Sequence, residues 1–179
     1  MSQPTIRVAT ADDAARLADF AGRTFRETYL PDNRAEDVEA YAVAHFGVAR
    51  QRAELGDPAM RTLLLVSADG ALVGYAQLRR DEAPAGDASA GIELARFYVD
   101  RPWHGRGVAD LLMDACVADA GRATLRLCVW RGNARAIRFY ERRGFRVVGT
   151  QRFTMGEDVQ DDHLMARTPS DPGLPERDA

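Results

Sequence analysis

The residues best suited to chemistry lie in one segment, Val99-Asp100-Arg101-Pro102-Trp103-His104-Gly105-Arg106-Gly107-Val108-Ala109. An apolar run precedes the two glycines and an amphipathic run follows them, which predicts a strand, a loop and the start of a helix. Amides at a helix start carry the positive end of the helix dipole and bind anions. Gly105 and Gly107 allow unusual φ angles and close approach, and Arg106 can add a charged contact. The segment therefore predicts an anion site suited to a diphosphate.

Two common phosphate-binding patterns do not fit this segment. A dinucleotide-binding turn needs a third glycine three residues after Gly107, where Asp110 stands. A P-loop needs a lysine, and the chain contains none: its basic side chains other than histidine are all arginine. An ordinary structural turn stays open as an alternative interpretation.

A second segment has the spacing of a strand followed by a short helix. It is Leu125-Arg126-Leu127-Cys128-Val129-Trp130-Arg131-Gly132-Asn133-Ala134-Arg135-Ala136-Ile137-Arg138-Phe139-Tyr140-Glu141-Arg142-Arg143-Gly144-Phe145. Asn133 is a good helix N-cap, and Ala136 and Tyr140 share one face of the helix. The small Ala136 leaves room along that face, and Tyr140 places a phenol beyond it. The alternatives are that Asn133 only caps the helix and that Tyr140 is an ordinary core residue.

Together the two segments resemble motifs A and B of the GNAT superfamily of N-acetyltransferases. The first family pattern is Arg or Gln, two residues, Gly, one residue, then Gly or Ala, and here His104, Gly107 and Ala109 take the three defined positions. The second, Asn-x-x-Ala-x-x-Phe/Leu-Tyr-x-x-x-Gly-Phe, is complete from Asn133 to Phe145. The resemblance covers residues 5–167. His104 is a departure that can weaken cofactor binding or make it depend on pH.

The resemblance implies direct transfer of an acetyl group from acetyl-CoA to an amine within a ternary complex. It implies that the cofactor contacts Phe97, Tyr98, Val99, His104, Gly105, Arg106, Gly107, Val108, Ala109, Asn133, Ala136 and Tyr140. Tyr140 is then the acid that protonates the leaving thiolate, because a phenol with a pKa of about 10 is protonated at neutral pH. A backbone amide near Val99, on a strand that diverges from Cys128–Trp130, is expected to polarise the thioester carbonyl.

Glu93 is the candidate base that removes a proton from the amine, through a water molecule. It lies on the strand that leads into the glycine loop, and strict alternation places it on the same face as Ala95, Phe97 and Val99. A surface or structural carboxylate is the alternative.

The acceptor pocket is expected between the two N-terminal helical regions and a mobile loop over residues 81–91. Acids outnumber bases across Glu27–Glu39, which favours a cationic amine, although a solvated helix face is the alternative. We take Glu27, Tyr29 and Trp130 as substrate-binding residues. Two stretches, Phe25–Tyr29 and Met155–Met165, are similar to spermidine/spermine-type bacterial N-acetyltransferases. The expected acceptor is therefore a polyamine or another small amine.

Two other functions stay open. The acceptor can be a protein N-terminus or a lysine side chain, or the fold can bind an acyl-CoA as a sensor without turnover. A non-catalytic binder is expected to lose Tyr140 or to fill the groove at Ala136, and both residues are present.

Composition limits the class of protein. The formal net charge of −3 disfavours nucleic acid as a partner. The two cysteines, Cys116 and Cys128, form neither a disulfide framework nor a metal-ligand spacing, so no metal is predicted. The sequence shows no secretory signal and no membrane-spanning run, so we expect a cytoplasmic protein without a membrane partner. Homodimers are common in the superfamily that the chain resembles.

The fold class is predicted as α/β. We expect one GNAT-like domain over residues 1–167 and a disordered tail over residues 168–179. The domain has a mixed, mostly antiparallel sheet of about seven strands, flanked by about four helices. Expected strands are 5–9, 61–68, 71–79, 92–99, 123–130, 145–149 and 163–167. One helix is expected to begin after Thr10, and further helical regions are expected over residues 35–55, 107–120 and 133–143.

Overall fold

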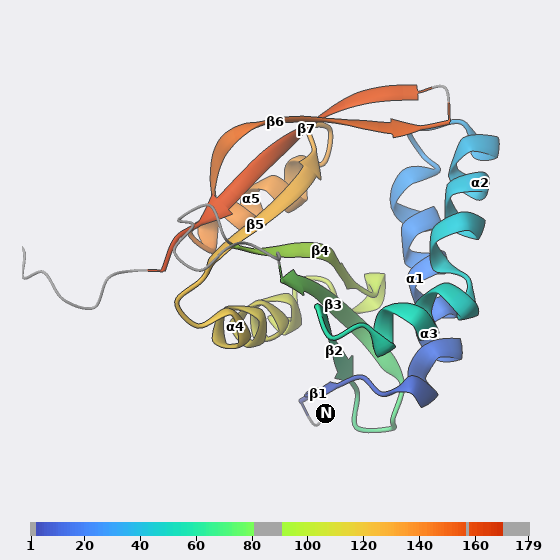
Figure 1. The fold of residues 1–179 in the computed structure, drawn as a ribbon, viewed down its shortest axis with the longest axis vertical. Helices are drawn as coiled ribbons and strands as arrows, with labels where there is room; N and C mark the ends of the chain where they lie inside the picture. The colour runs from blue at the N-terminus through green and yellow to red at the C-terminus, as the bar shows by residue number, and fades with distance from the viewer. Residues whose placement is uncertain (1–2, 81–90, 157, 170–179) are drawn as a thin grey trace, which may run out of the picture.

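The computed structural model describes residues 3–80, 91–156 and 158–169, and it places them in one sheet with helices on both faces (Figure 1). The sheet has the strand order β1-β2-β3-β4-β5-β7-β6. Its strands are β1 (Thr5–Val8), β2 (Met60–Val66), β3 (Leu72–Arg80), β4 (Gly91–Val99), β5 (Thr124–Trp130), β6 (Arg146–Met155) and β7 (Asp158–Arg167). The α-helices are α1 (Ala14–Tyr29), α2 (Ala35–Phe46), α3 (Val48–Gly56), α4 (Val108–Ala120) and α5 (Ala134–Arg142). The predicted fold class is confirmed.

The helical start predicted after Thr10 is a 3-10 turn over Ala11–Asp13, and α1 continues from it at Ala14. Asp13, which is 4 % exposed, accepts hydrogen bonds from the Thr10 amide at 2.8 Å and from the Arg7 guanidinium at 2.6 and 2.7 Å. These bonds satisfy donors at the helix start and join it to β1. The apolar side of α1 packs on the sheet through Leu17, Phe20, Ala21 and Phe25.

The region Ala35–Leu55, predicted as one helical region, consists of two helices. Gly47 interrupts it with an extended backbone, with φ −65° and ψ 154°. An extended residue cannot continue the i to i−4 hydrogen-bond pattern, so α2 ends at Phe46 and α3 begins at Val48. The described residues therefore form five α-helices rather than the four expected.

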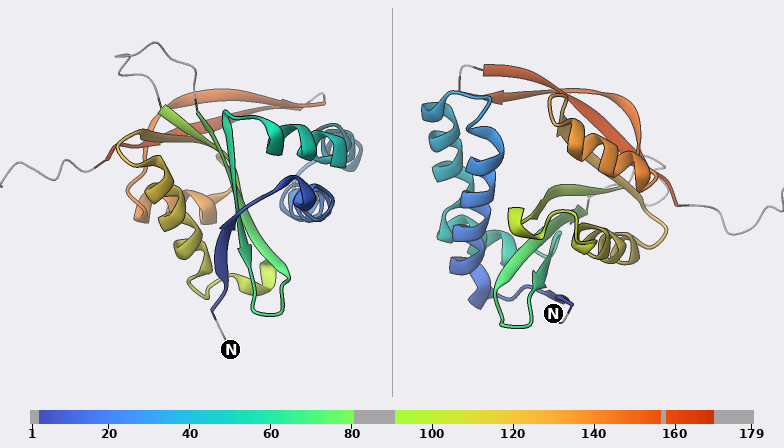
Figure 2. Two further views of the ribbon diagram at one scale, coloured as in Figure 1. Left: turned by 60° about the horizontal axis from the view of Figure 1, so that its bottom comes forward. Right: turned by 180° about the vertical axis from the view of Figure 1, so that it is seen from behind.

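The helices divide between the two faces of the sheet (Figure 2). Helices α4 and α5 cover one face, which we call the α4/α5 face, where α4 buries Leu112, Met113 and Cys116. Helices α1 and α2 cover the other, the α1/α2 face, where Phe25 and Val38 pack in a cluster with Tyr75 of β3. Each face of the sheet thus has its own apolar core.

Strands β4 and β5 are parallel, but they stay paired only briefly. Their register joins Gly91 to Thr124, Ile92 to Leu125 and Glu93 to Arg126. Beyond this point β4 pairs only with β3, whereas β5 pairs with β7 as far as Trp130 opposite Asp162. The two strands therefore diverge toward their carboxyl ends, as Figure 1 shows.

The register of β4 against β3 shifts by one residue, which leaves Ala95 without a partner. Such a bulge reverses the alternation of side chains, so Leu94 and Phe97 both pack in the α4/α5-face cluster. Glu93, next to Leu94, therefore lies on the opposite face from Phe97 and Val99. The prediction from strict alternation is wrong because it counts Ala95 as an ordinary strand residue.

Strands β6 and β7 are longer than predicted and form a hairpin that reaches α2. The turn at Gly156 has a φ of +63°, and a Cβ there would clash with the Asp37 side chain of α2. Polar residues fill much of both strands, so their apolar pattern is too weak to mark their full length. The extension brings the start of β7 beside the N-terminal helices.

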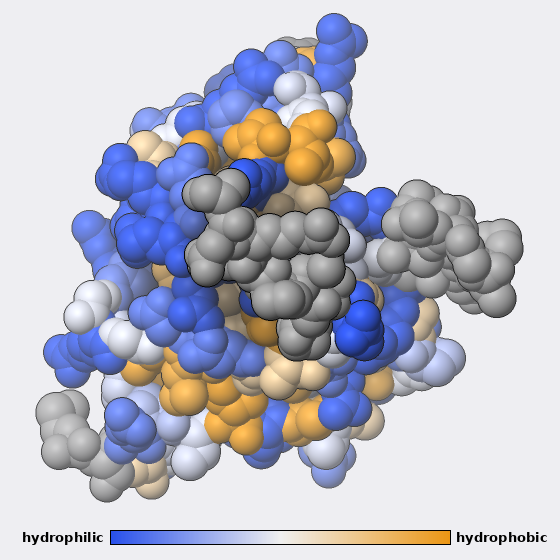
Figure 3. Space-filling model, turned by 90° about the vertical axis from the view of Figure 1, so that its left-hand side faces the viewer, coloured by the Kyte–Doolittle hydropathy of each residue, from blue (hydrophilic) through white to orange (hydrophobic). Residues whose placement is uncertain are grey.

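The side of the molecule shown in Figure 3 is mostly hydrophilic, with apolar side chains gathered in separate groups. Large apolar residues at the surface include Val147 and Val148 of β6 and Val159 of β7. None of the described helices is both long and apolar enough to cross a membrane. The loop predicted over residues 81–91 lies outside the described residues except for Gly91, as does the predicted tail beyond residue 169.

Asp13→Asn is expected to lower the free energy of unfolding by about 1–3 kcal/mol at neutral pH, because it weakens charge-assisted bonds to a buried group. The hydrogen bonds from Arg7 hold the pKa of Asp13 well below its usual range. Such a carboxylate stabilises the fold above its unfolded pKa of about 4, and this contribution is lost as pH falls toward its lower folded pKa.

Urea unfolding at pH 7 and at successively lower pH checks this. The difference between wild type and Asp13→Asn should shrink as the solution is acidified. Asp12→Asn, at an exposed neighbour, is the matched control and should stay within about 0.5 kcal/mol of wild type. An Asp13→Asn protein as stable as this control at pH 7 would contradict the role given to Asp13.

Candidate functional site

The glycine loop joins the end of β4 to the start of α4. A 3-10 turn over Arg101–Trp103 is followed by Gly105 with a φ of +73° and Gly107 with a φ of +76°. Side chains rarely adopt this left-handed region, so both positions favour glycine. A Cβ at either position would meet no atom within 4 Å, so the glycines serve the backbone conformation and leave the space beside them open.

Several consecutive amides of this loop are free to bind a ligand. Among the described residues, the amides of Gly105, Arg106 and Gly107 donate to no backbone carbonyl, and the first α4 amide to do so is that of Leu111, to Gly107 at 3.1 Å. The Val108 side chain is buried in the α4/α5-face cluster and anchors the helix start. The predicted anion site therefore has the free donors and the helix end that a diphosphate needs.

His104, the departure from the family pattern, connects three parts of the site. Its Nε2 lies 2.8 Å from the Val99 carbonyl oxygen and its Nδ1 lies 2.5 Å from the Arg135 guanidinium. A carbonyl only accepts and a guanidinium only donates, so these contacts assign the neutral Nε2–H tautomer. His104 thus ties the loop to the end of β4 and to α5.

Helix α5 carries the residues of the second motif. The Asn133 side chain accepts a hydrogen bond from the Ala136 amide at 3.1 Å, so Asn133 caps the helix. The Trp130 ring packs against Gly132, where a Cβ would overlap the ring. Ala136 is half-buried beside the α4/α5-face cluster.

Tyr140 is buried at the far end of the same helix face. Its ring lies 6.2 Å from that of Phe97 and 5.7 Å from that of Phe145, and 8 % of the residue is exposed. Burial raises the pKa of Tyr140 above the ordinary value, and the nearby Tyr29 adds to this. The phenol is therefore protonated at neutral pH, as a proton donor must be.

Tyr29 and Tyr98, predicted separately for substrate and cofactor, lie together. Burial raises the pKa of Tyr29 to about 12, and the neighbouring Tyr98 offsets part of this rise. The Tyr98 ring stacks on Tyr75 with the centroids 5.7 Å apart. The carboxyl end of α1 therefore meets β4 on the α1/α2 face, close to where β4 and β5 diverge.

A family model of the acetyltransferase (GNAT) family matches residues 19–145. The chain belongs to the GNAT family of acetyltransferases. It is therefore an acyltransferase, and the resemblance predicted from its two motifs is confirmed.

Known proteins similar to this GNAT chain agree with the assignment. An uncharacterised N-acetyltransferase of Mycobacterium tuberculosis is 37 % identical over 158 residues, 87 % of this chain and 97 % of the relative. The PaiA N-acetyltransferase of Thermoplasma acidophilum, solved with coenzyme A, is 22 % identical with a TM-score of 0.76, over 94 % of this chain and 100 % of that one. A spermidine N-acetyltransferase SpeG chimera from Vibrio cholerae and hSSAT is 21 % identical with a TM-score of 0.62. The match covers 93 % of this chain and 96 % of that one. The two structures support the fold alone.

Glu93, the predicted base of this GNAT chain, is engaged by a neighbour. Its carboxylate forms an ion pair with Arg79, the residue opposite it in β3. The side chain is 32 % exposed and lies on the α1/α2 face. A structural carboxylate and a base acting through water both remain compatible with this position.

The acids predicted to attract a cationic substrate are mostly paired. Glu27 lies 2.9 Å from Arg23, and Glu39 lies 2.6 Å from Arg26. Both arginines precede the stretch Glu27–Glu39, so the net charge counted over that stretch does not include them. The surface of α1 and α2 is therefore less negative than the stretch alone predicts.

Asp162 of β7 is a functional candidate that the sequence patterns miss. It is 8 % exposed, and its Oδ1 atom is buried without a hydrogen-bond partner. It stands opposite Trp130, and its charge contributes to the raised pKa of Tyr29. The signal was weak because the predicted strand begins at His163, one residue too late to include it.

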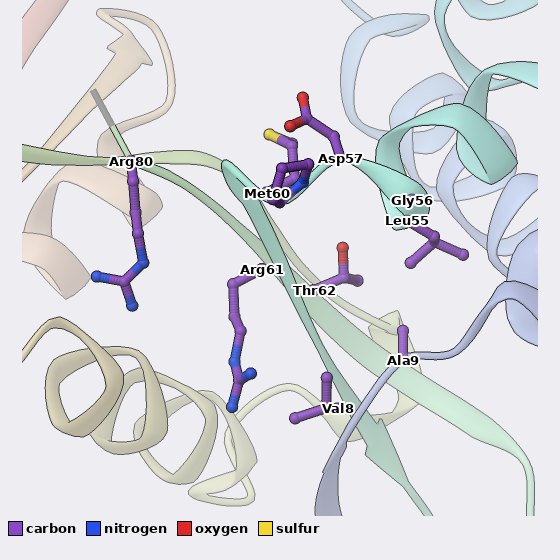
Figure 4. A pocket seen from close by; sticks show the side chains of 10 residues that line it. Val8, Ala9, Leu55, Gly56, Asp57, Met60, Arg61, Thr62 and Arg80 are labelled. Atoms are coloured by element: carbon purple, nitrogen blue, oxygen red, sulfur yellow. The ribbon is translucent and has the colours of Figure 1, made fainter. Parts of the chain in front are cut away.

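A hollow of about 380 Å³ lies elsewhere, between the first two strands and the end of α3 (Figure 4). Arg61 and Arg80 line it, and each guanidinium lies 3.0 Å from the Asp119 carboxylate of α4. None of the predicted site residues lines this hollow. Over the described part of the chain, no three potential metal ligands gather into a cluster.

His104→Ala is expected to loosen the glycine loop, because it removes both contacts of the ring. Each exposed hydrogen bond contributes about 1 kcal/mol, so the backbone order parameters of Gly105–Val108 should fall. His104→Gln keeps a donor for the Val99 carbonyl and should give intermediate values. NMR relaxation measures the order parameters, and equal values in all three proteins would contradict the role given to His104.

Proposed function

We propose that this GNAT protein transfers the acetyl group of acetyl-CoA to a small cationic amine. The observation that carries the proposal is the run of free amides at Gly105–Ala109, next to two diverging strands and a buried, protonated Tyr140. The free amides suit a diphosphate, and the diverging strands suit a thin pantetheine arm. The protonated Tyr140 suits a leaving thiolate.

The residues that would hold the cofactor come from β4, the loop and α5. The loop amides and Arg106 bind the diphosphate, and His104 keeps the loop in place. Phe97, Tyr98 and Val99 of β4 border the pantetheine arm on one side, and Asn133 and Ala136 border it on the other. When bound, acetyl-CoA supplies an acetyl group activated as a thioester.

The side chains divide the proton transfers between the two faces of the sheet. Tyr140 donates a proton to the leaving sulfur, and Glu93 accepts one from the amine through a water molecule. An amide near Val99, where β4 has no β5 neighbour, donates a hydrogen bond to the thioester oxygen. Donors of this kind are worth about 3 kcal/mol in the transition state.

The acceptor is proposed as a small cation because of the residues on the α1/α2 face. Tyr29 and Trp130 offer aromatic surface to an ammonium group. Glu27 at the end of α1 adds negative charge, although Arg23 offsets part of it. A protein N-terminus or lysine side chain is the alternative acceptor. A sensor without turnover is disfavoured because Tyr140 and the small Ala136 are retained.

Release of free thiol from acetyl-CoA tests the function. Purified protein is incubated with polyamines, simple diamines, an N-terminal peptide and a lysine peptide, and products are checked by mass for one added acetyl group. We expect thiol release with the small amines. Release with peptides alone would overturn the choice of acceptor, and stabilisation by acetyl-CoA without release from any amine would support the sensor.

Tyr140→Phe is expected to lower kcat by about 100-fold, because general acid catalysis contributes this order of rate. The affinity for acetyl-CoA should change little, since the ring keeps its packing. Tyr75→Phe is the matched control, because the Tyr75 hydroxyl is buried without a partner and the residue packs on the opposite face of the sheet from Tyr140. Steady-state kinetics and calorimetry measure both quantities, and an unchanged kcat would remove Tyr140 from the acid role.

A further inference from the structure

Asp162 occupies an interior position of the sheet, and the strand pairing fixes the face on which its side chain lies. Strand β7 lies between β5 and β6, and Asp162 stands opposite Trp130 and Gln151. In β5, Leu127 and Val129 pack on the α4/α5 face, so Trp130 points to the other face. Residues opposite one another share a face, and Asp162 therefore points to the same side as Trp130.

The carboxylate of Asp162 has no partner there. Its Oδ1 atom is buried and unpaired, and none of the ion pairs among the described residues includes it. The nearby cation, Arg131, instead donates to Thr150 at 2.9 Å and lies 3.9 Å from Asp161. A buried charge without a partner is unfavourable, so a contribution to stability does not account for an aspartate at this position.

The ionisable groups around Asp162 do not neutralise it. They are Tyr29 of α1, Cys128 of β5, Arg131 after β5, and Asp161 and His163 of β7. Burial raises the pKa of Asp162, and the charges of His163 and Arg131 only partly offset this. The His163 Nδ1 atom is itself buried without a partner.

We propose that the Asp162 carboxylate anchors the acceptor by accepting a charge-assisted hydrogen bond from its ammonium group. The inference rests on the proposed function and narrows the acceptor to amines that are cations when they bind. Two observations carry it: the unpaired buried oxygen, and its place opposite Trp130. The acids Glu27 and Glu39 on α1 and α2 already have arginine partners, which leaves Asp162 to recognise the charge.

Kinetics with an accepted amine from the panel test the anchor. Asp162→Asn should raise KM for the amine by about 10- to 100-fold, the range expected for a hydrogen bond to a charged group, with little change in acetyl-CoA affinity. Asp161→Asn is the matched control, because Asp161 is an exposed neighbour on the other side of the strand. An unchanged KM in Asp162→Asn, or equal effects in both variants, would overturn the proposal.

Stability separates an anchor from a structural residue. A carboxyl group whose pKa is raised by folding stabilises the fold below its unfolded pKa, and this contribution is lost as pH rises through the folded pKa. Asp162→Asn should therefore unfold at the same or a higher temperature than wild type at neutral pH. A clear loss of thermal stability at neutral pH in Asp162→Asn would show a structural role and overturn the proposal.

A binding measurement keeps the anchor testable if no amine is acetylated. The Asp162 carboxyl carbon is titrated by NMR in the full-length protein, with and without spermidine and in the presence of coenzyme A. A cation bound at Asp162 must lower its apparent pKa. If wild type releases no thiol but spermidine lowers this pKa, the proposed function fails and the anchor stands. If spermidine leaves the pKa unchanged, the anchor is overturned, whatever the activity.

Discussion

The short pairing of β4 with β5 is the constraint on which the candidate site depends. The two parallel strands share three residue pairs, after which β4 continues with β3 and β5 with β7. Backbone groups on the facing edges of β4 and β5 are left without a strand partner where the two strands diverge. The free amides of the glycine loop follow one strand, and the Asn133–Tyr140 face of α5 follows the other. One interruption of the sheet therefore positions both halves of the site.

Buried polar groups mark the two sides of this interruption. On the α4/α5 face Tyr140 keeps its proton because burial disfavours its charged form. On the α1/α2 face Asp162 keeps a carboxylate without a partner. Neither arrangement is the most favourable one for the stability of the fold. Both suit the proposed reaction, in which a cationic amine loses a proton and a leaving thiolate gains one.

The sequence was sufficient where the signals are local. The glycine loop between a strand and a helix, and the Asn133 cap, depend on residues close in the chain, and these two predicted features are confirmed. The sequence was insufficient where strand pairing across the sheet decides which face a side chain lies on. The bulge at Ala95 moves Glu93 to the other face, and Asp162 becomes visible only once β7 is aligned with β5. The roles of Glu93, Tyr140 and the other site residues stay predictions.

An NMR titration of the isotope-labelled protein with acetyl-CoA locates the bound cofactor residue by residue. We expect the largest amide shifts at Gly105, Gly107 and Val108, with further shifts along Asn133–Tyr140. Shifts centred instead on the hollow lined by Arg61 and Arg80, with the glycine loop unaffected, would contradict this placement of the cofactor.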